Sequence, residues 1–468
     1  MIVMKFGGSS VESATAIQRV ASIVRARLDR KPVVVVSAMG KTTNKLLAIA
    51  DQAVKGEREE SLNLLHELHE FHLRELRTAV SDQRYSEIQA VVDGMFHDVE
   101  ELVRGLAIMG ELTPRSIDAI SSFGERVSSV IVAAAFDNMG VPAIQVDSRD
   151  FIITDKRHTH AAPLFTQSYS RLAAGIPPLA RERVVVMGGF IGSTEDGVTS
   201  TLGRGGSDYS ASIIGAGIDA EEIQIWTDVD GMLTADPTIL PGGHRVRIIS
   251  FSEAAELAYF GAKVLHPSTV LPAVDKNIPV LILNSRRPEV EGTRIIRDSV
   301  KSSNPAKSIA CKKNITVLSI HSTRMLMAHG FLRQIFEIFD RYETPVDMVA
   351  TSEVSVSLTI DDDSQLADIC LELEKFAEVD VERGQAIVCI VGENIRHTPG
   401  ISARVFESLR DINVRMISQG ASLLNISIAV AQSDLRSAVE ALHTEFFREF
   451  DPAVFEPAAV SASVGPWS

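Results

Sequence analysis

The chain has 468 residues, of which 45% are hydrophobic and 23% are charged. This length exceeds what one hydrophobic core usually supports, so we expect two or three domains, and the balance is that of a globular protein rather than a disordered or fibrous one. The 46 basic and 61 acidic residues give a net charge of -15, which argues against nucleic acid or an anionic membrane surface as a partner.

Short apolar runs alternate with helical stretches over roughly the first 300 residues. Because continuous apolar strands between helices are typical of a sheet covered on both faces, we predict an α/β fold with a mainly parallel sheet sandwiched by helices. The predicted strands are IVMKF, VVVVSAM, AIQVD, VVVMGGF, IQIWTD and PVLIL. Residues 45–109 have a helical pattern with a leucine stripe, and the polar segment 297–308 marks a domain boundary.

The motif KFGGSS, residues 5–10, directly follows the first predicted strand and precedes a helical run. Gly7 and Gly8 let backbone N–H groups approach an anion, the helix N-terminus adds partial positive charge, and Lys5 adds a full charge. Phosphate is therefore the natural ligand. A Gly-Gly turn beside a snorkelling lysine is the competing explanation.

The motif SAMGKTTN, residues 37–44, follows the second predicted strand. Its Gly-Lys-Thr resembles the end of a Walker A loop, but Val35 stands where that loop needs its first glycine, so we exclude a P-loop NTPase. The hydroxyl groups suit a small polar substrate. The alternative is a helix N-cap formed by Thr42 or Thr43.

The glycine-rich motif TLGRGGSDYSAS, residues 201–212, precedes another helix. Glycines around Arg204 leave its guanidinium free for bidentate capture of a carboxylate. Ser207 and Asp208 sit where a helix would be capped, so a plain loop with a capping aspartate is the alternative.

Three further polar groups accompany predicted strand or helix ends. Thr227 and Asp228 in WTDVDGMLTADP leave a strand at the edge where parallel sheets bind ligands, and the motif lacks the other ligands of a calcium loop. Glu125 in FGE starts an apolar helix, where the helix dipole alone would explain a carboxylate. Lys263 in FGAKVLHP lies near a helix end, where a surface lysine is the default.

Two groups of histidines are assigned no function. His66, His69 and His72 recur every three residues rather than at the i, i+4 spacing of a helical zinc pair, so we expect a solvated helix flank. His158 and His160 lie in a polar loop without a ligand cluster. No metal-ligating residues are predicted.

The C-terminal part contains an internal repeat with a spacing of 70 residues. Gly330 and Phe331 correspond to Gly400 and Ile401, and the run 356–360 corresponds to 426–430. Each copy has the pattern of a ferredoxin-like βαββαβ unit. Edges of such small sheets readily pair with another copy, so we expect a homodimer or a higher homo-oligomer.

The cysteines and the N-terminus indicate the compartment. Cys311, Cys370 and Cys389 form no Cys-x-x-Cys pair, so neither a disulfide framework nor a zinc site is predicted. The start MIVMKFGG does not have the apolar core of a signal peptide, and no apolar run approaches the ~18 residues that span a bilayer. We expect a cytoplasmic protein without a membrane partner.

Taken in order, these motifs resemble those of the aspartokinases along nearly the whole chain. The motifs are KFGGSSV, SAMGKTTN, SFGERVSS, GGFIGS, TLGRGGSDYSA, WTDVDGMLTADP, FGAKVLHP and TSEVSVSLTI. The single-function, lysine-sensitive members are most similar, because the chain ends at Ser468 without an attached dehydrogenase domain. The resemblance implies an amino acid kinase fold over 1–298 and two ACT domains, the first at 309–385 with 450–468 as a candidate completion, the second at 386–449.

The resemblance also implies an activity and a set of site residues. The γ-phosphoryl group of ATP would pass to the β-carboxylate of L-aspartate with Mg²⁺, the first step toward lysine, threonine and methionine. The implied ATP-binding residues are Lys5, Gly7, Gly8, Ser9, Thr227, Asp228 and Lys263. The implied aspartate-binding residues are Ser37, Thr43, Glu125, Arg204 and Ser207, with Lys5, Asp208 and Lys263 as catalytic residues. Arg204 would pair with a substrate carboxylate and Glu125 with the substrate ammonium.

MLMAHGFL and VDMVATSEVS resemble the effector-binding segments of lysine-inhibited relatives. The implied effector residues are Met325, Gly330, Phe331, Leu332, Val346, Asp347, Ser352 and Glu353. The acidic pair would receive a cationic amino acid, so we expect lysine as the effector, with threonine as the alternative.

Two competing hypotheses remain. Acetylglutamate, glutamate and UMP kinases share the architecture, and the repeated C-terminal unit favours aspartate over their acceptors. A non-catalytic amino-acid sensor is a different class, against which the presence of Lys5, Arg204, Asp208 and Lys263 argues.

Overall fold

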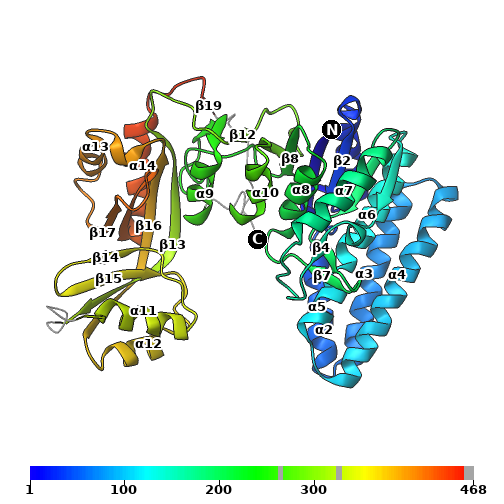
Figure 1. Cartoon of the computed structure of the whole chain (residues 1–468), viewed down its shortest axis with the longest axis horizontal. Coiled ribbons are helices and arrows are strands. Elements are labelled where there is room, and N and C mark those ends of the chain that lie inside the picture. The colour runs from blue at the N-terminus through cyan, green and yellow to red at the C-terminus, as the bar shows by residue number, and fades with distance from the viewer. Residues whose placement is uncertain (262–266, 323–328, 458–468) are drawn as a thin grey trace. The chain divides into compact units, whose positions relative to one another are not determined.

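A computed structural model describes residues 1–261, 267–322 and 329–457 (Figure 1). The chain forms two compact units. Unit 1 comprises Met1–Gly231 and Leu265–Arg297, and unit 2 comprises Met232–Val264 and Asp298–Ser468. Residues 232–264, which the resemblance includes in the kinase domain 1–298, belong to the second compact unit.

The main sheet of unit 1 is mostly parallel, as predicted. Its strands follow the order β12-β11-β8-β1-β2-β5-β3, and only β12 runs antiparallel to its neighbour β11. The strand bounds are β1 Ile2–Phe6, β2 Pro32–Val36, β3 Ala143–Val146, β5 Val184–Gly188, β8 Glu222–Thr227, β11 Val280–Asn284 and β12 Thr293–Ile296. All six predicted strands are present, and the α/β fold class is confirmed.

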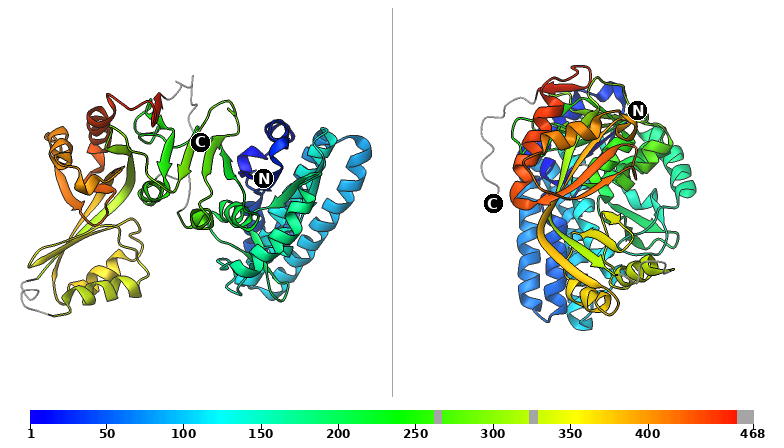
Figure 2. Two further views of the ribbon diagram at one scale, coloured as in Figure 1. Left: turned by 45° about the horizontal axis from the view of Figure 1, so that its top comes forward. Right: turned by 90° about the vertical axis from the view of Figure 1, so that its left-hand side faces the viewer.

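Helices cover both faces of this sheet. Their bounds are α1 Ala14–Arg25, α2 Thr42–Val54, α3 Arg58–Ala79, α4 Asp82–Met109, α5 Pro114–Ser121, α6 Phe123–Asn138, α7 Phe165–Leu179, α8 Gly206–Gly217 and α10 Leu271–Asp275. The long helices α3 and α4 pack along each other, as two further views show (Figure 2). A small second sheet has the order β4-β6-β7, with β4 Ile153–Thr154, β6 Ile191–Thr194 and β7 Thr199–Thr201.

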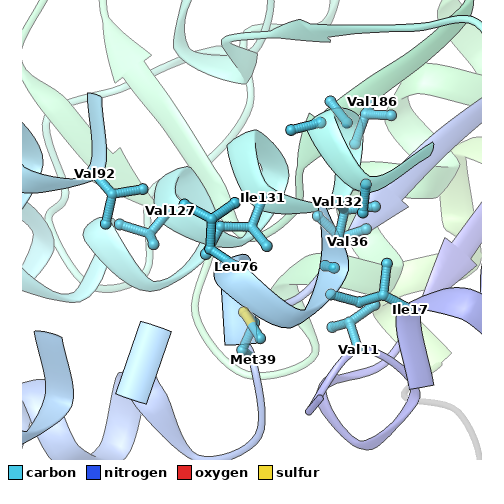
Figure 3. Packing of buried hydrophobic residues seen from close by; sticks show 14 of the residues in the cluster. Val11, Ile17, Val36, Met39, Leu76, Val92, Val127, Ile131, Val132 and Val186 are labelled. Atoms are coloured by element: carbon cyan, nitrogen blue, oxygen red, sulfur yellow. The ribbon is translucent and has the colours of Figure 1, made fainter. Parts of the chain in front are cut away.

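One face of β1 and the helices α1 to α4 and α6 contribute to a large hydrophobic core. Figure 3 labels Val36, Ile131 and Leu76 among the side chains of this cluster, which come from a strand and two helices. Within the described residues, the segment Pro114–Asn138 is the one stretch long and apolar enough to cross a membrane. However, 89% of its apolar window is buried in the protein, as in the core helix of a globular fold.

Unit 2 contains a six-stranded sheet with the order β14-β15-β13-β16-β18-β17. Its strands are β13 Ala306–His321, β14 Val349–Thr351, β15 Ser355–Ile360, β16 Glu378–Gly392, β17 Val414–Gln419 and β18 Asn425–Ala431. The helices of this unit are α9 Phe251–Tyr259, α11 Phe331–Arg341, α12 Leu366–Leu373, α13 Ile401–Ser408 and α14 Leu435–Phe447. Three short strands complete it: β9 His244–Val246, β10 Ile248–Ser250 and β19 Phe455–Pro457.

The 70-residue repeat is visible in this sheet. Helices α11 and α13 both begin after a left-handed glycine, Gly330 with φ 86° and Gly400 with φ 80°. The first copy has the order β14-β15-β13-β16, and the second has β17-β18-β16-β13. The long strands β13 and β16 therefore belong to both copies. The second copy uses residues 306–312 of β13, which pair with 387–392 of β16.

Candidate active site

Lys5 and Asp208 form an ion pair between β1 and α8. Ile2, Met4 and Phe6 point into the main core, so the alternation of side chains along β1 turns Lys5 toward the opposite face. Helix α8 packs against β1, and the Lys5 Nζ lies 2.7 Å from the Asp208 Oδ1. Both side chains are largely buried, at 12% and 16% exposed, so their charges interact in a medium less polar than bulk water.

Gly8 allows the KFGG and SAMG turns to approach closely. A Cβ at Gly8 would lie 2.8 Å from the carbonyl oxygen of Gly40 and 2.9 Å from that of Ala38. Any larger residue would push the turns apart, because such distances are shorter than van der Waals contact. The Gly40 N–H donates to the Gly8 carbonyl at 3.1 Å, and the Ser37 N–H donates to the Phe6 carbonyl at 3.1 Å. The two motifs thus meet at the carboxyl edge of the sheet.

Glu125 is a buried carboxyl group in the first turn of α6. Its Oε1 accepts a hydrogen bond from the Ala38 N–H at 3.2 Å. Its Oε2 is buried and has no hydrogen-bond partner within the described part of the chain. Burial raises the pKa of Glu125 to about 8. The cost of removing the carboxylate from water therefore outweighs the stabilisation expected from the helix dipole. A ligand carrying a cationic donor would satisfy Oε2.

These groups surround a cavity of about 300 Å³ in unit 1. Its lining residues are Lys5, Ser37, Thr43, Glu125, Phe190, Gly203, Gly205, Gly206, Ser207 and Asp208. The cavity therefore combines an ammonium, hydroxyl groups and carboxyl groups, a set that suits a small zwitterion with an extra carboxylate. A larger open groove of about 1150 Å³ on α13 and α14 holds none of the predicted residues.

Arg204 stands at the edge of this cavity rather than in its lining. It is exposed and has no ion-pair partner in the described segments, and it lies between Gly203 with φ 77° and Gly205 with φ 71°. The alternative of a plain loop with a capping aspartate is wrong for α8. Gly205 is the N-cap residue, without a side-chain hydrogen bond, so Asp208 is available to Lys5.

The capping alternative for the SAMGKTTN motif is also wrong. Helix α2 has Lys41 at its N-cap and no capping side chain. The Thr42 hydroxyl instead donates to the Met39 carbonyl at 2.7 Å. Thr43 lines the cavity, as described above.

The predicted nucleotide residues lie at the carboxyl ends of β1 and β8. The Gly7 N–H donates to the Trp226 carbonyl at 3.2 Å, which brings the KFGGSS turn beside Thr227. The Thr227 hydroxyl donates to the Asp228 Oδ1 at 3.2 Å. Ser9 belongs to a short 3-10 helix, Gly8–Ser10, in the same turn. Lys263 lies outside the described residues.

Ser285 is a residue of this edge that the motif analysis missed. Its N–H donates to the Thr227 carbonyl at 2.8 Å, and its hydroxyl lies 2.8 Å from that of Ser10. The sequence held a signal for Ser285, because this residue directly follows Asn284, the last residue of β11, and β11 is a neighbour of β8. In a parallel pair both carboxyl ends meet at one edge.

The predicted effector residues lie in unit 2, apart from Met325, which is outside the described residues. Phe331 and Val346 contribute to one hydrophobic cluster, and Leu332 is exposed beside Phe331. Ser352 and Glu353 are exposed in the turn between β14 and β15.

Asp347 is already paired. Its Oδ1 lies 2.7 Å from the Lys312 Nζ, and its side chain is 4% exposed. Lys312 also lies 2.7 Å from the Asp361 Oδ2. Burial raises the pKa of Asp347 although Lys312 opposes that shift. An internal ammonium therefore occupies Oδ1 of the carboxylate that the resemblance assigns to a cationic effector, while Oδ2 is buried without a hydrogen-bond partner among the described residues.

The expectation of a solvated histidine flank is wrong for His72. Its side chain is buried, its Nδ1 lies 2.7 Å from the Leu68 carbonyl oxygen, and burial lowers its pKa to about 4. His69 pairs with Asp93 at 2.8 Å. No group of three potential metal-ligating His, Cys, Asp or Glu side chains occurs among residues 1–261, 267–322 and 329–457.

Comparison with known proteins gives a consistent result. Residues 1–284 match the model of the amino acid kinase family, and residues 388–446 match that of an ACT domain. The chain is 41% identical over 477 residues to the chloroplastic aspartokinase 1 of Arabidopsis thaliana, an alignment that covers 96% of this chain and 80% of that protein.

Two crystal structures of Escherichia coli aspartokinase III, each 35% identical, are also similar. The complex with lysine and aspartate has a TM-score of 0.84 and covers 96% of this chain and 99% of that one. The complex with aspartate and ADP has a TM-score of 0.79 and covers 96% of this chain and 100% of that one.

The burial of Glu125 predicts a pH-dependent stability. Below its ordinary pKa of 4.5 the carboxyl is neutral in both folded and unfolded chains. As pH rises toward about 8, the unfolded chain ionises while the folded site keeps its proton, so stability is lost through this window. Glu125→Gln cannot ionise, and without ligand it should be more stable than the wild type above about pH 8, by at most on the order of 5 kcal/mol.

Urea unfolding followed by tryptophan fluorescence at stepped pH would measure this difference. The difference should grow between about pH 5 and pH 8 and then level off. The exposed Glu182→Gln is the control and should show no such trend. A constant difference for Glu125→Gln across the whole range would contradict the neutral carboxyl.

Proposed function

The chain belongs to the amino acid kinase family and is an aspartokinase, and on that premise we propose that the cavity beside Lys5 holds L-aspartate during the transfer. The observation that carries this proposal is the buried, unpartnered Oε2 of Glu125, a residue that lines a small cavity of mixed charge. The substrate ammonium would pair with Glu125. Arg204 would swing from its exposed position to a substrate carboxylate, and Ser37, Thr43 and Ser207 would supply hydrogen bonds.

The chemistry needs no general base. The attacking side-chain carboxylate has an ordinary pKa of about 3.9 and is ionised at neutral pH. One of its oxygens attacks the γ-phosphorus, the bond from that phosphorus to the β,γ-bridging oxygen breaks, and ADP leaves with the bonding electrons. The products are 4-phospho-L-aspartate and ADP. The barrier comes mainly from bringing two anions together.

Lys5 is the residue we propose to offset that repulsion. Its ammonium stands at the end of β1 beside the Gly7–Gly8 turn, whose N–H groups suit phosphate oxygens. Asp208 would hold Lys5 in place before the phosphates arrive. Ser9, Thr227, Asp228 and Lys263 complete the proposed nucleotide side. The Escherichia coli relative described with aspartate and ADP supports a shared site for both substrates.

Mg²⁺ fits this site as a companion of ATP rather than as a protein-bound ion. The described residues contain no group of three potential metal-ligating side chains, and Asp208 is engaged by Lys5. Mg²⁺ commonly keeps several waters and binds through phosphate oxygens with few carboxylates. When bound, it would neutralise phosphate charge. Asp228, on the nucleotide side, would accept a hydrogen bond from a water bound to Mg²⁺.

We propose feedback control through the ACT region by an amino acid, lysine first and threonine as the alternative. The Escherichia coli relative crystallised with lysine supports lysine as the effector.

We also propose that the first ACT copy is inserted in the second, because β13 supplies residues 306–312 to the second copy. The edge strands β14 and β17 are candidates for pairing in a homodimer, and we propose a cytoplasmic location.

The role of Lys5 predicts a large kinetic effect. Lys5→Ala should lower kcat/KM by roughly a thousandfold or more while the fold persists, because the cation facing the phosphates is lost. A coupled ADP assay with aspartate, ATP and Mg²⁺ would measure it, with circular dichroism to verify folding. Lys41→Ala is the matched control, since Lys41 would matter only in a Walker A loop. Turnover of Lys5→Ala near the wild-type level would refute the assignment.

Aspartate binding should release a proton from Glu125. Near pH 7 the free carboxyl is mostly neutral because its pKa is about 8, and pairing with an ammonium would ionise it. Calorimetric titration in buffers of different ionisation enthalpy should give close to one proton released per aspartate, falling as pH rises past about 8. Glu125→Gln should release none. Equal release by both proteins would exclude the Glu125–ammonium pair.

The Lys312–Asp347 pair predicts how effector sensitivity can be changed. Lys312→Met should leave Asp347 and Asp361 without their cation and so favour an incoming ammonium. The lysine concentration for half-inhibition should fall about fivefold to tenfold, with little change for threonine, which lacks a second ammonium. The exposed neighbour variant Lys313→Met is the control. Weaker inhibition by lysine in Lys312→Met would show that the internal pair supports the effector site.

A further inference from the structure

Asp118 on α5 is a fully buried carboxylate that joins three segments of unit 1. Its Oδ1 accepts the Thr201 hydroxyl at 2.5 Å, and its Oδ2 lies 2.7 Å from the His158 Nδ1. The Thr159 N–H donates to both oxygens, at 3.0 and 3.1 Å. The side chain is 0% exposed, so these donors, rather than water, stabilise its charge. Helix α5, the loop 158–160 and the end of β7 are thereby tied to one group.

The loop 158–160 is held in a strained conformation by this carboxylate. Thr159 has φ 68°, a left-handed conformation that β-branched residues rarely adopt. Such a conformation persists only where the surroundings impose it, and the two bonds from the Thr159 N–H to Asp118 do so.

The same loop packs directly against the glycine-rich turn before α8. A Cβ at Gly203 would lie 2.9 Å from the His160 Cδ2 and 3.2 Å from the Thr159 carbonyl oxygen. Gly203 itself precedes Arg204, and Thr201 stands two residues before Gly203. Asp118 therefore fixes the turn twice, through the Thr201 hydroxyl at its start and through the Thr159–His160 segment that covers Gly203.

We propose that Asp118, with His158 and Thr201, is a positioning group that fixes the backbone of the turn from which Arg204 reaches the aspartate carboxylate. This proposal rests on the proposed role of Arg204. Arg204 is exposed and has no ion-pair partner within the described ranges, so the backbone of the turn is what directs it. Asp118 does not line the cavity and touches no reacting atom. Its effect on catalysis passes through the turn.

Steady-state kinetics with each substrate varied in turn would test this role. Asp118→Asn should raise the KM for aspartate at least about tenfold, while the KM for ATP changes less than about twofold, because the turn faces the acceptor side. Thr201→Val, which removes one hydroxyl, should act in the same direction, and Thr201→Ser should restore nearly normal values. The double variant Asp118→Asn/Thr201→Val should have a KM for aspartate no higher than that of Asp118→Asn, because the Thr201 hydroxyl acts through its bond to Asp118.

Matched variants separate the possible failures. Asp155→Asn alters another aspartate that binds backbone N–H groups of the same loop, at Arg157 and Ala162, and should leave both KM values unchanged. If Asp118→Asn does not fold, the contrast between Thr201→Val and Thr201→Ser decides. Equal increases in both KM values, or no rescue by serine, would overturn the positioning role. If Arg204→Ala leaves the KM for aspartate unchanged, the proposed role of Arg204 itself fails.

Discussion

The parallel alignment of β1 with β2 and β8 is the constraint on which the catalytic unit depends. Two anions have to meet in a protein that is itself acidic, so the attractive groups must be concentrated at one place. Parallel strands end at the same edge, and each of these three is followed by a turn that carries polar groups. The register of β1 decides which face of the sheet carries Lys5, because a one-residue slip would turn this side chain into the apolar core.

Much of the fold and part of the candidate site follow from local pattern. The six apolar runs are all strands, and the glycine turns after β1, β2 and β5 mark the carboxyl edge. Lys5, Ser37 and Glu125 could be identified because each lies within a few residues of a strand or helix end. Their convergence on one cavity follows from the topology of a parallel sheet.

What the sequence could not reveal depends on contacts between distant segments. Asp118 and His158 are 40 residues apart and belong to an unremarkable helix and a polar loop, so no local pattern links them. His72 looks like a member of a solvated flank because its neighbours are polar, and only the packing of α3 against α2 and α4 buries it. The capping alternatives fail for a related reason, because the Thr42 hydroxyl bonds the Met39 carbonyl and Asp208 pairs with Lys5.

The long strands β13 and β16 of the six-stranded sheet make the two copies of the C-terminal repeat depend on each other. Because β13 and β16 each serve both copies of the repeat, excising either copy would strip its neighbour of a hydrogen-bonded strand and expose a raw edge. The two copies are therefore expected to fold and unfold together, as one piece.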